Sequence, residues 1–171
     1  WYDLTASGVL ESYITMKERA ESEFARKNQK LIMGPWIHSL DLPSVAGTLN
    51  FGMASSGVAI DVCGTHIRWF DYWLKGTKND IMDEPPVRIF VMGENVWRSE
   101  NEWPLARTKY TKFYLHSDGA ANSCSGDGKL NIDLPFEEKL DAYRYDPGNP
   151  VPSKPGAIGA EIIMGAFDYQ E

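Results

Sequence analysis

The sequence has few of the residues that hold metal ions or disulfide frameworks, with only 2 cysteines and 3 histidines among 171 residues. Cys63 and Cys124 stand far apart in the chain, which matches neither the paired spacing of a zinc motif nor a disulfide scaffold. Long apolar runs are also missing, because no stretch approaches the roughly 18 residues of a membrane-spanning helix. These absences disfavour a structural metal site, a disulfide-rich scaffold and a membrane-spanning segment.

Positive charge is scarce as well. Lys and Arg number 17 against 24 Asp and Glu, which leaves a formal net charge of -7. That balance argues against the phosphate backbone of a nucleic acid and against an anionic membrane surface as partners. The apolar fraction of 43% is typical of a globular chain. We therefore expect one folded domain, or parts of two, with no nucleic-acid or membrane partner; oligomerisation stays open.

Up to residue 84 the pattern alternates between helix and strand. Residues 7–27, "SGVLESYITMKERAESEFARK", predict one amphipathic helix of about 20 residues, because their apolar side chains recur at helical spacing. Residues 30–34, "KLIMG", predict a short buried strand that ends at Gly34-Pro35, and residues 39–58 predict a loop.

A second helix is predicted over residues 61–76, "DVCGTHIRWFDYWLKG". Asp61 suits its N-cap, and Gly76 suits the position just after its last turn. Helix, strand, loop and helix in this order are typical of an α/β layered protein.

The pattern changes after Pro85-Pro86. "VRIFVMG" and "TKYTKFYLHS" predict strands, and all prolines except Pro35 and Pro43 lie at or beyond residue 85. No helix longer than two turns is expected from residue 87 onward. We therefore expect two domains, residues 1–84 with an α/β pattern and residues 85–171 as the opening of an all-β sandwich.

His38, shortly after the predicted strand at 30–34, is the main candidate for a catalytic residue. In α/β sheets, ligands bind beyond the carboxyl ends of the strands, and His38 lies just past such an end. Asp3 follows "WY", which resembles the end of a preceding strand, so two neighbouring strand ends would bring Asp3 and His38 together. A carboxylate beside an imidazole fixes the tautomer of the ring during general-base catalysis.

Structural interpretations stand beside this catalytic one. A single His after a strand is often structural or simply exposed, and Asp3 could be only the N-cap of the helix that follows it. His66 falls within the second predicted helix, where it would pack or face solvent. His116 falls in a turn region, where we expect it to be exposed.

The sequence contains no G-x-S-x-G motif, the turn that presents a nucleophilic Ser in α/β-hydrolases. The chain also starts at Trp1 without an initiator Met and stops within "GAFDYQE". We interpret it as an internal fragment, so that a nucleophile and any targeting signal would lie upstream. The cellular compartment is not predicted.

An ordered set of short motifs resembles one family. "WYD", "GPWIHS", "RWFDYWLKGTKNDI", "PPVRIFVMGENVWRSENEWP", "FYLHSDGAANS" and "YDPGNPVPS" together are similar to the CocE/NonD serine hydrolases. These enzymes include esterases and acylases and are related to the X-prolyl dipeptidyl-peptidases. The resemblance covers nearly the whole chain in order.

The resemblance implies a fold and an activity. It implies that residues 1–84 form the C-terminal part of an α/β-hydrolase domain and that residues 85–171 begin a jelly-roll, galactose-binding-like domain. It also implies that Asp3 and His38 are the acid and base of a Ser-His-Asp triad that cleaves a small-molecule ester or amide. No metal ion and no organic cofactor is implied. The alternative is a non-catalytic, carbohydrate- or ligand-binding β-sandwich attached to a degenerate hydrolase core.

Overall fold

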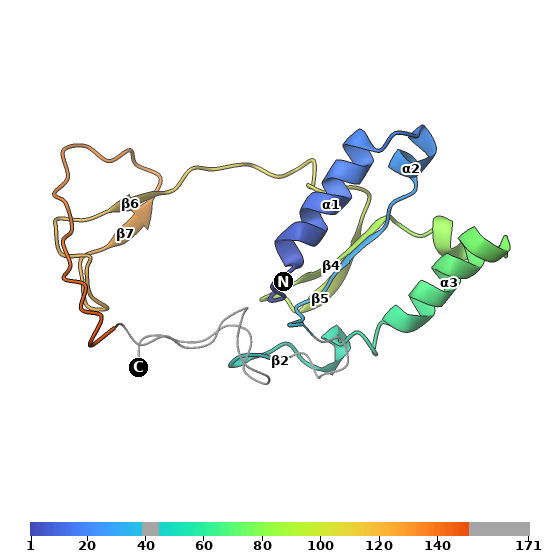
Figure 1. Cartoon of the computed structure of the whole chain (residues 1–171), viewed down its shortest axis with the longest axis horizontal. Helices are drawn as coiled ribbons and strands as arrows, with labels where there is room; N and C mark the ends of the chain where they lie inside the picture. Colours follow the sequence, from blue (N-terminus) through green and yellow to red (C-terminus); the bar gives the residue numbers. More distant parts are fainter. Residues whose placement is uncertain (39–44, 151–171) are drawn as a thin grey trace. The chain divides into compact units, whose positions relative to one another are not determined.

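A computed structural model describes residues 1–38 and 45–150. By its internal contacts the described chain forms two compact units, residues 1–106 and residues 107–150, which are treated separately here (Figure 1). The first unit contains every helix of the described residues and a mixed sheet. The second contains one small antiparallel sheet. The described chain is therefore built of small sheets and few helices.

The sheet of the first unit has the strand order β1-β4-β5, formed by Leu31–Met33, Val87–Val91 and Val96–Glu100. β1 and β4 are parallel, with Leu31 opposite Val87, and β4 and β5 are antiparallel. The strands predicted within residues 30–34 and 87–93 are therefore confirmed. β5 was not predicted, although the positive φ of Gly93 (90°) and Asn95 (55°) marks the tight turn that leads into it.

Helix α1, Ala6–Arg19, packs against one face of this sheet (Figure 1). Tyr13 is its buried residue, only 5% exposed. Tyr13 belongs to a core cluster with the strand residues that point to the same face, namely Leu31, Met33, Val87 and Ile89. The alternation of these residues along β1 and β4 is the reason that one sheet face is apolar.

The single helix predicted over residues 7–27 is wrong, because two helices form there. α1 ends at Arg19, Ala20 adopts an extended backbone, and α2 begins at Glu23 and ends at Lys27. The hydroxyl of Ser22 accepts the backbone N–H of Ala25 at 3.1 Å and so caps a new helix. Arg26 donates to the carbonyl of Ala20, which stabilises the break.

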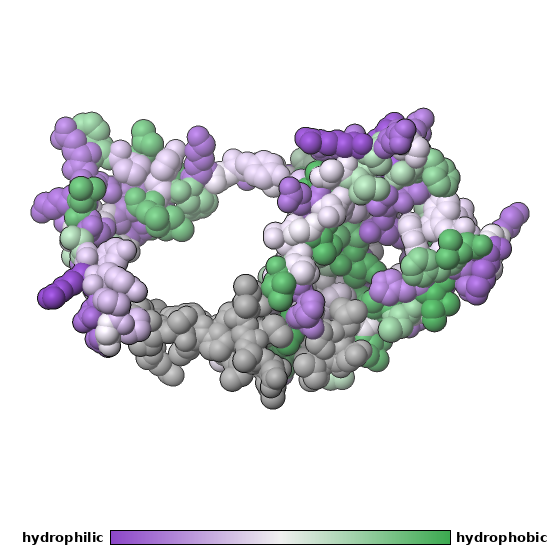
Figure 2. All heavy atoms as spheres, in the orientation of Figure 1, coloured by the Kyte–Doolittle hydropathy of each residue, from purple (hydrophilic) through white to green (hydrophobic). Residues whose placement is uncertain are grey.

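Helix α3, Val62–Lys75, confirms the prediction for residues 61–76. The carboxylate of Asp61 accepts the backbone N–H of Gly64, and Gly76 ends the helix with φ of 68°. One side of α3 exposes large apolar residues, and Figure 2 shows hydrophobic atoms gathered over this helix among charged ones. These residues are Ile67, Phe70 and Leu74.

The segment predicted as a loop, residues 39–58, contains short elements where it is described. β2 (Val45–Ala46) and β3 (Leu49–Asn50) form a small hairpin, and a 3-10 turn η1 follows at Met53–Ser55. This segment covers part of the second sheet face, where Phe90 is 1% exposed. Its core cluster also contains Ile37, Ala46 and Phe51. A further 3-10 turn, η2, lies at Asp80–Met82.

The second unit pairs β6, Tyr114–His116, with antiparallel β7, Lys129–Asn131. Within residues 107–150 the structure contains no helix, in agreement with the all-strand-and-loop prediction for this part of the chain. The remainder of that prediction, residues 151–171, lies outside the described residues. The division between residues 84 and 85 stays a prediction; β4 and β5, which follow it, pair with β1 and with each other.

Replacement of Phe90 by Ala should destabilise the first unit strongly. Phe90 is buried and contacts the rings of Phe51 and Trp97 at centroid distances of 6.0 and 5.3 Å. The cavity left behind should lower the free energy of unfolding by about 3–5 kcal/mol in denaturant titrations. Phe70→Ala is the matched control in the same unit, because Phe70 is 55% exposed. A control that costs as much as Phe90→Ala would contradict this assignment of the core.

Candidate active site

The chain leaves β1 through a tight turn at Gly34-Pro35-Trp36. The indole of Trp36 lies against Gly34 so closely that a Cβ atom there would meet the ring at 2.3 Å. Glycine is therefore required at position 34 by this packing. Pro35 is fully buried, and the Trp36 indole N–H donates to the carbonyl of Ser55 at 2.8 Å. These contacts fix the direction in which the chain continues to His38.

The first residues of the chain run beside this turn and are bound to it. The backbone N–H of Tyr2 donates to the carbonyl of Trp36 at 3.0 Å. The indole N–H of Trp1 donates to the carbonyl of Phe90 in β4 at 2.9 Å. Asp3, the next residue, is thereby held beyond the end of β1 on the side where His38 emerges.

Asp3 and His38 form the hydrogen bond that the sequence predicted. Nδ1 of His38 lies 2.8 Å from Oδ2 of Asp3. An ionised carboxylate can only accept, so Nδ1 carries the proton and donates it. The imidazole is 60% exposed at its side chain, whereas Asp3 is 23% exposed. This arrangement leaves Nε2 as the basic nitrogen of the neutral ring; the catalytic roles of both residues stay predictions.

The other carboxylate oxygen of Asp3 has its own donors. The backbone N–H and the hydroxyl of Thr5 both approach Oδ1, at 2.6 and 2.5 Å. Burial raises the pKa of Asp3, but the hydrogen bonds from Thr5 and His38 outweigh it and hold that pKa below its ordinary value. The alternative that Asp3 is only the N-cap of α1 is wrong, because the N-cap of this helix is Thr5.

A cavity of about 230 Å³ lies beside Asp3. Its walls include Trp1, Thr5, Val9, Met33, Trp36 and His66. His66 is exposed on α3, as predicted, and forms no hydrogen bond within residues 1–38 and 45–150. Of the two imidazoles of the first unit, only that of His38 is therefore paired with a carboxylate.

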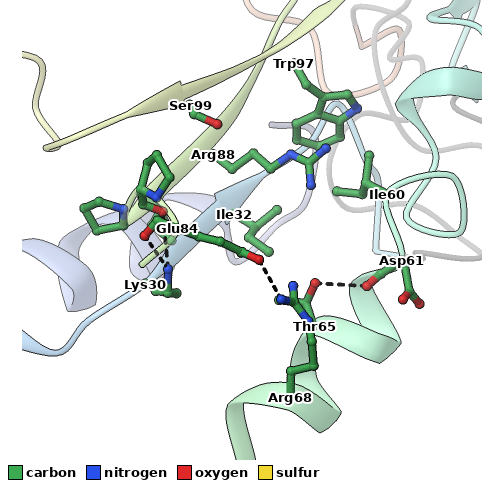
Figure 3. A pocket seen from close by; sticks show the side chains of 13 residues that line it. Lys30, Ile32, Ile60, Asp61, Thr65, Arg68, Glu84, Arg88, Trp97 and Ser99 are labelled. Carbon is green, nitrogen blue, oxygen red and sulfur yellow. Dashed lines mark hydrogen bonds and ion pairs between the residues drawn. The ribbon is translucent and has the colours of Figure 1, made fainter. Parts of the chain in front are cut away.

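A second cavity, of about 300 Å³, lies where β1 and β4 begin (Figure 3). Arg68 of α3 forms an ion pair with Glu84 at 2.6 Å, and Lys30 donates to the carbonyl of Glu84 at 2.8 Å. Burial lowers the pKa of Lys30. The guanidinium of Arg88 lies over the ring of Trp97. The residues that line this cavity include paired charges and no imidazole or thiol.

His116, in the second unit, was predicted to be exposed, and this is wrong. Its side chain is 13% exposed, and Nδ1 lies 2.5 Å from Oε1 of Glu138. The second carboxylate oxygen of Glu138 accepts the backbone N–H of Ser117 at 3.2 Å. The Ser117 hydroxyl donates to Asp141 at 2.9 Å. The pair therefore connects β6 to the segment around residues 138–141, which sequence spacing alone gave no means to foresee.

In the described part of the chain, no group of three or more His, Cys, Asp or Glu side chains is arranged to hold a metal ion. Among the same residues, none of the helices combines the length and the hydrophobicity needed to cross a bilayer.

Comparison with known proteins identifies relatives along most of the chain. Residues 79–160 match the family described as the X-Pro dipeptidyl-peptidase C-terminal non-catalytic domain. Over 158 residues, 92% of this chain, the sequence is 37% identical to cocaine esterase of Rhodococcus sp. (strain MB1 Bresler). It is 31% identical over 129 residues, 69% of this chain, to proteins of Mycobacterium bovis and Mycobacterium tuberculosis named "Putative serine esterase".

The chain spans only a part of the length of each of these relatives. The chain spans about a quarter of cocaine esterase (26%) and about a fifth (19%) of each mycobacterial protein. The family match begins at residue 79, so Asp3 and His38 lie outside it. The comparisons therefore indicate a fragment related to hydrolases, and the geometry of Asp3 and His38 is a separate observation.

The contact between His116 and Glu138 should make the stability of the second unit depend on pH. The hydrogen bond to Glu138 raises the pKa of His116, and the same bond lowers the pKa of Glu138. The stability that the charged form of His116 contributes to the folded unit is fully present below its unfolded pKa of about 6.5. This stability is lost as pH rises through the folded pKa. The stability that ionised Glu138 contributes is fully present above its unfolded pKa of about 4.3. This stability is lost as pH falls through the folded pKa.

Protection of the β6 and β7 amides from hydrogen exchange should therefore be greatest between about pH 4.3 and 6.5. Asp118, Asp127 and Lys129 line a cavity together with His116 and Glu138, so their charges also act on this pair. His116→Gln should remove the loss of protection above that window, and Glu138→Gln should remove the loss below it. Equal pH dependence in the wild type and both variants would refute the role of this pair.

Proposed function

Because this chain is related to the CocE/NonD hydrolases and the X-Pro dipeptidyl-peptidases, we propose that Asp3 and His38 are the acid and base of a Ser-His-Asp triad. The observation that carries the proposal is the 2.8 Å contact between Nδ1 of His38 and Oδ2 of Asp3, at the end of a parallel strand. The substrate would be a small ester or amide, cleaved through an acyl-enzyme.

In this mechanism the proton travels through His38. Nε2 accepts the proton of the Ser hydroxyl as its oxygen attacks the substrate carbonyl, and the imidazolium then protonates the leaving alcohol or amine. Water attacks the acyl-enzyme in the second half, again through Nε2, and releases the acid. The exposed ring of His38 is accessible to both the nucleophile and water.

In this mechanism Asp3 maintains the tautomer of the His38 imidazole that catalysis requires. Its ionised carboxylate accepts from Nδ1–H, which holds the tautomer with a basic Nε2 and stabilises the positive charge that forms on the ring. The low pKa of Asp3 supports this role, because a protonated carboxyl would give no such stabilisation.

The proposal needs a nucleophile that this chain does not contain, since no G-x-S-x-G motif occurs in it. In the longer protein that we propose, an upstream segment supplies the Ser and the oxyanion-hole donors. Residues 1–84 would then be the C-terminal part of an α/β-hydrolase domain, and residues 85–171 the start of a jelly-roll domain. Asp before His is the order of an α/β-hydrolase triad.

A second candidate function concerns the later part of the chain. The family that matches residues 79–160 is described as non-catalytic, which favours a ligand-binding β-sandwich for this segment. The two functions are separable by the upstream sequence. A nucleophile turn between a strand and a helix supports the hydrolase, and its absence supports the binding module.

Replacement of His38 by Ala should nearly abolish turnover of a p-nitrophenyl ester by the full-length protein. A Ser hydroxyl attacks poorly unless a base removes its proton, and loss of a triad member costs about 10⁴ or more in kcat in protease cases. Asp3→Asn should also be severe, because an amide permits the wrong tautomer and cannot stabilise the imidazolium.

His66→Ala is the comparison that distinguishes the two histidines of the first unit. It should retain most of the activity, because His66 has no hydrogen bond to Asp3 or His38 within the described residues. Circular dichroism should show that each variant keeps the wild-type fold. If His38→Ala keeps more than about a tenth of the wild-type turnover while His66→Ala loses it, the assignment of the base is wrong.

A further inference from the structure

We infer that Thr5 is a positioning residue for the Asp3–His38 pair: its hydroxyl holds one oxygen of Asp3 so that the other faces His38. The inference rests on the proposed hydrolase function, and it assigns a role to a residue outside the triad. Oδ1 of Asp3 receives Thr5 and Oδ2 receives His38, so each oxygen has its own donors. The plane of the carboxylate is fixed by bonds on both sides.

Such fixing is needed at this position. The terminal torsion of an Asp side chain is broad and roughly two-fold, so the carboxylate rotates unless its surroundings hold it. Asp3 is partly exposed, at 23% of its side chain, and stands beyond the end of β1. Within the described residues, the backbone N–H and the hydroxyl of Thr5 are the hydrogen-bond donors to Oδ1, at 2.6 and 2.5 Å, and they therefore set its orientation.

The hydroxyl of Thr5 does not form the hydrogen bond that is usual at its position in a helix. Thr5 is the N-cap residue of α1, a position where a Thr oxygen normally accepts a backbone N–H of the first turn. In this chain its side chain makes no capping bond, and it donates to Asp3 instead. Thr5 is also exposed, so its hydroxyl does not require this bond to satisfy a buried group. Neither helix capping nor the burial of the hydroxyl accounts for the contact, and its effect is to orient Asp3.

The contact has a chemical consequence as well as a geometric one. Donation from Thr5 favours the ionised carboxylate and is among the causes that lower the pKa of Asp3 against the effect of burial. The hydrogen bond from His38 also lowers the pKa of Asp3, and His66 lines the adjoining cavity.

The test compares Thr5→Val with Thr5→Ser in the full-length protein. Val keeps the shape and the backbone N–H but removes the hydroxyl, and Ser keeps the hydroxyl. We expect Thr5→Val to lower kcat by about tenfold or more with little change in KM, since small misplacement of a catalytic group is costly. Thr5→Ser should stay within about twofold of the wild type. Circular dichroism should show that both variants keep the wild-type fold, because Thr5 makes no side-chain cap.

A second readout does not depend on turnover. Carboxyl NMR titration should show a higher pKa for Asp3 in Thr5→Val than in the wild type, and a restored value in Thr5→Ser. Equal behaviour of the two variants in kcat and in this titration would overturn the inference. His38→Ala, measured in parallel, separates the two proposals. If it stays active, the hydrolase mechanism and the role of Thr5 both fail. If it is inactive while Thr5→Val is normal, the role of Thr5 fails alone.

Discussion

The parallel pairing of β1 with β4 is the constraint on which the first unit depends. It sets Leu31 opposite Val87 and Met33 opposite Ile89, which creates the apolar face that α1 covers through Tyr13. The pairing also aligns the carboxyl ends of the two strands, where polar groups beyond a sheet can converge. Without it neither the core nor the site beyond β1 would have a fixed frame.

The site takes its geometry from contacts that are mostly backbone and indole. Gly34 admits the ring of Trp36, and Trp36 in turn anchors the turn to Ser55. The N-terminal residues are then bound to this turn, so Asp3 meets His38 with little help from its own packing. An exposed imidazole paired with a half-buried carboxylate is a suitable arrangement for a base that must reach a nucleophile from another segment.

Features with a recognisable sequence motif were predictable, including one contact between residues that are 35 apart in the chain. The strand at residues 31–33, helix α3 with its caps, and the contact of Asp3 with His38 follow from short motifs whose physical requirements are local or familiar. The break after α1 was missed because Ser22 competes as an N-cap with a continuous apolar stripe. The partial burial of His116 depends on Glu138, a partner 22 residues away that no spacing rule identifies, whereas the local contact of Thr5 with Asp3 was not considered. The family resemblance supplied the assignment of roles, which residue patterns alone left open.

The bond from the indole of Trp1 to the carbonyl of Phe90 has a consequence for the order of folding. It joins the segment that carries Asp3 to β4, and β4 reaches β1 only after the chain from Leu31 to Val87 has closed into a long loop. Closing such a loop lowers the conformational entropy of the chain before stabilising contacts form, so pairings between distant segments form late. We therefore expect the contact of Asp3 with His38, which lie 35 residues apart in the chain, to form later than the local hydrogen bonds of the helices.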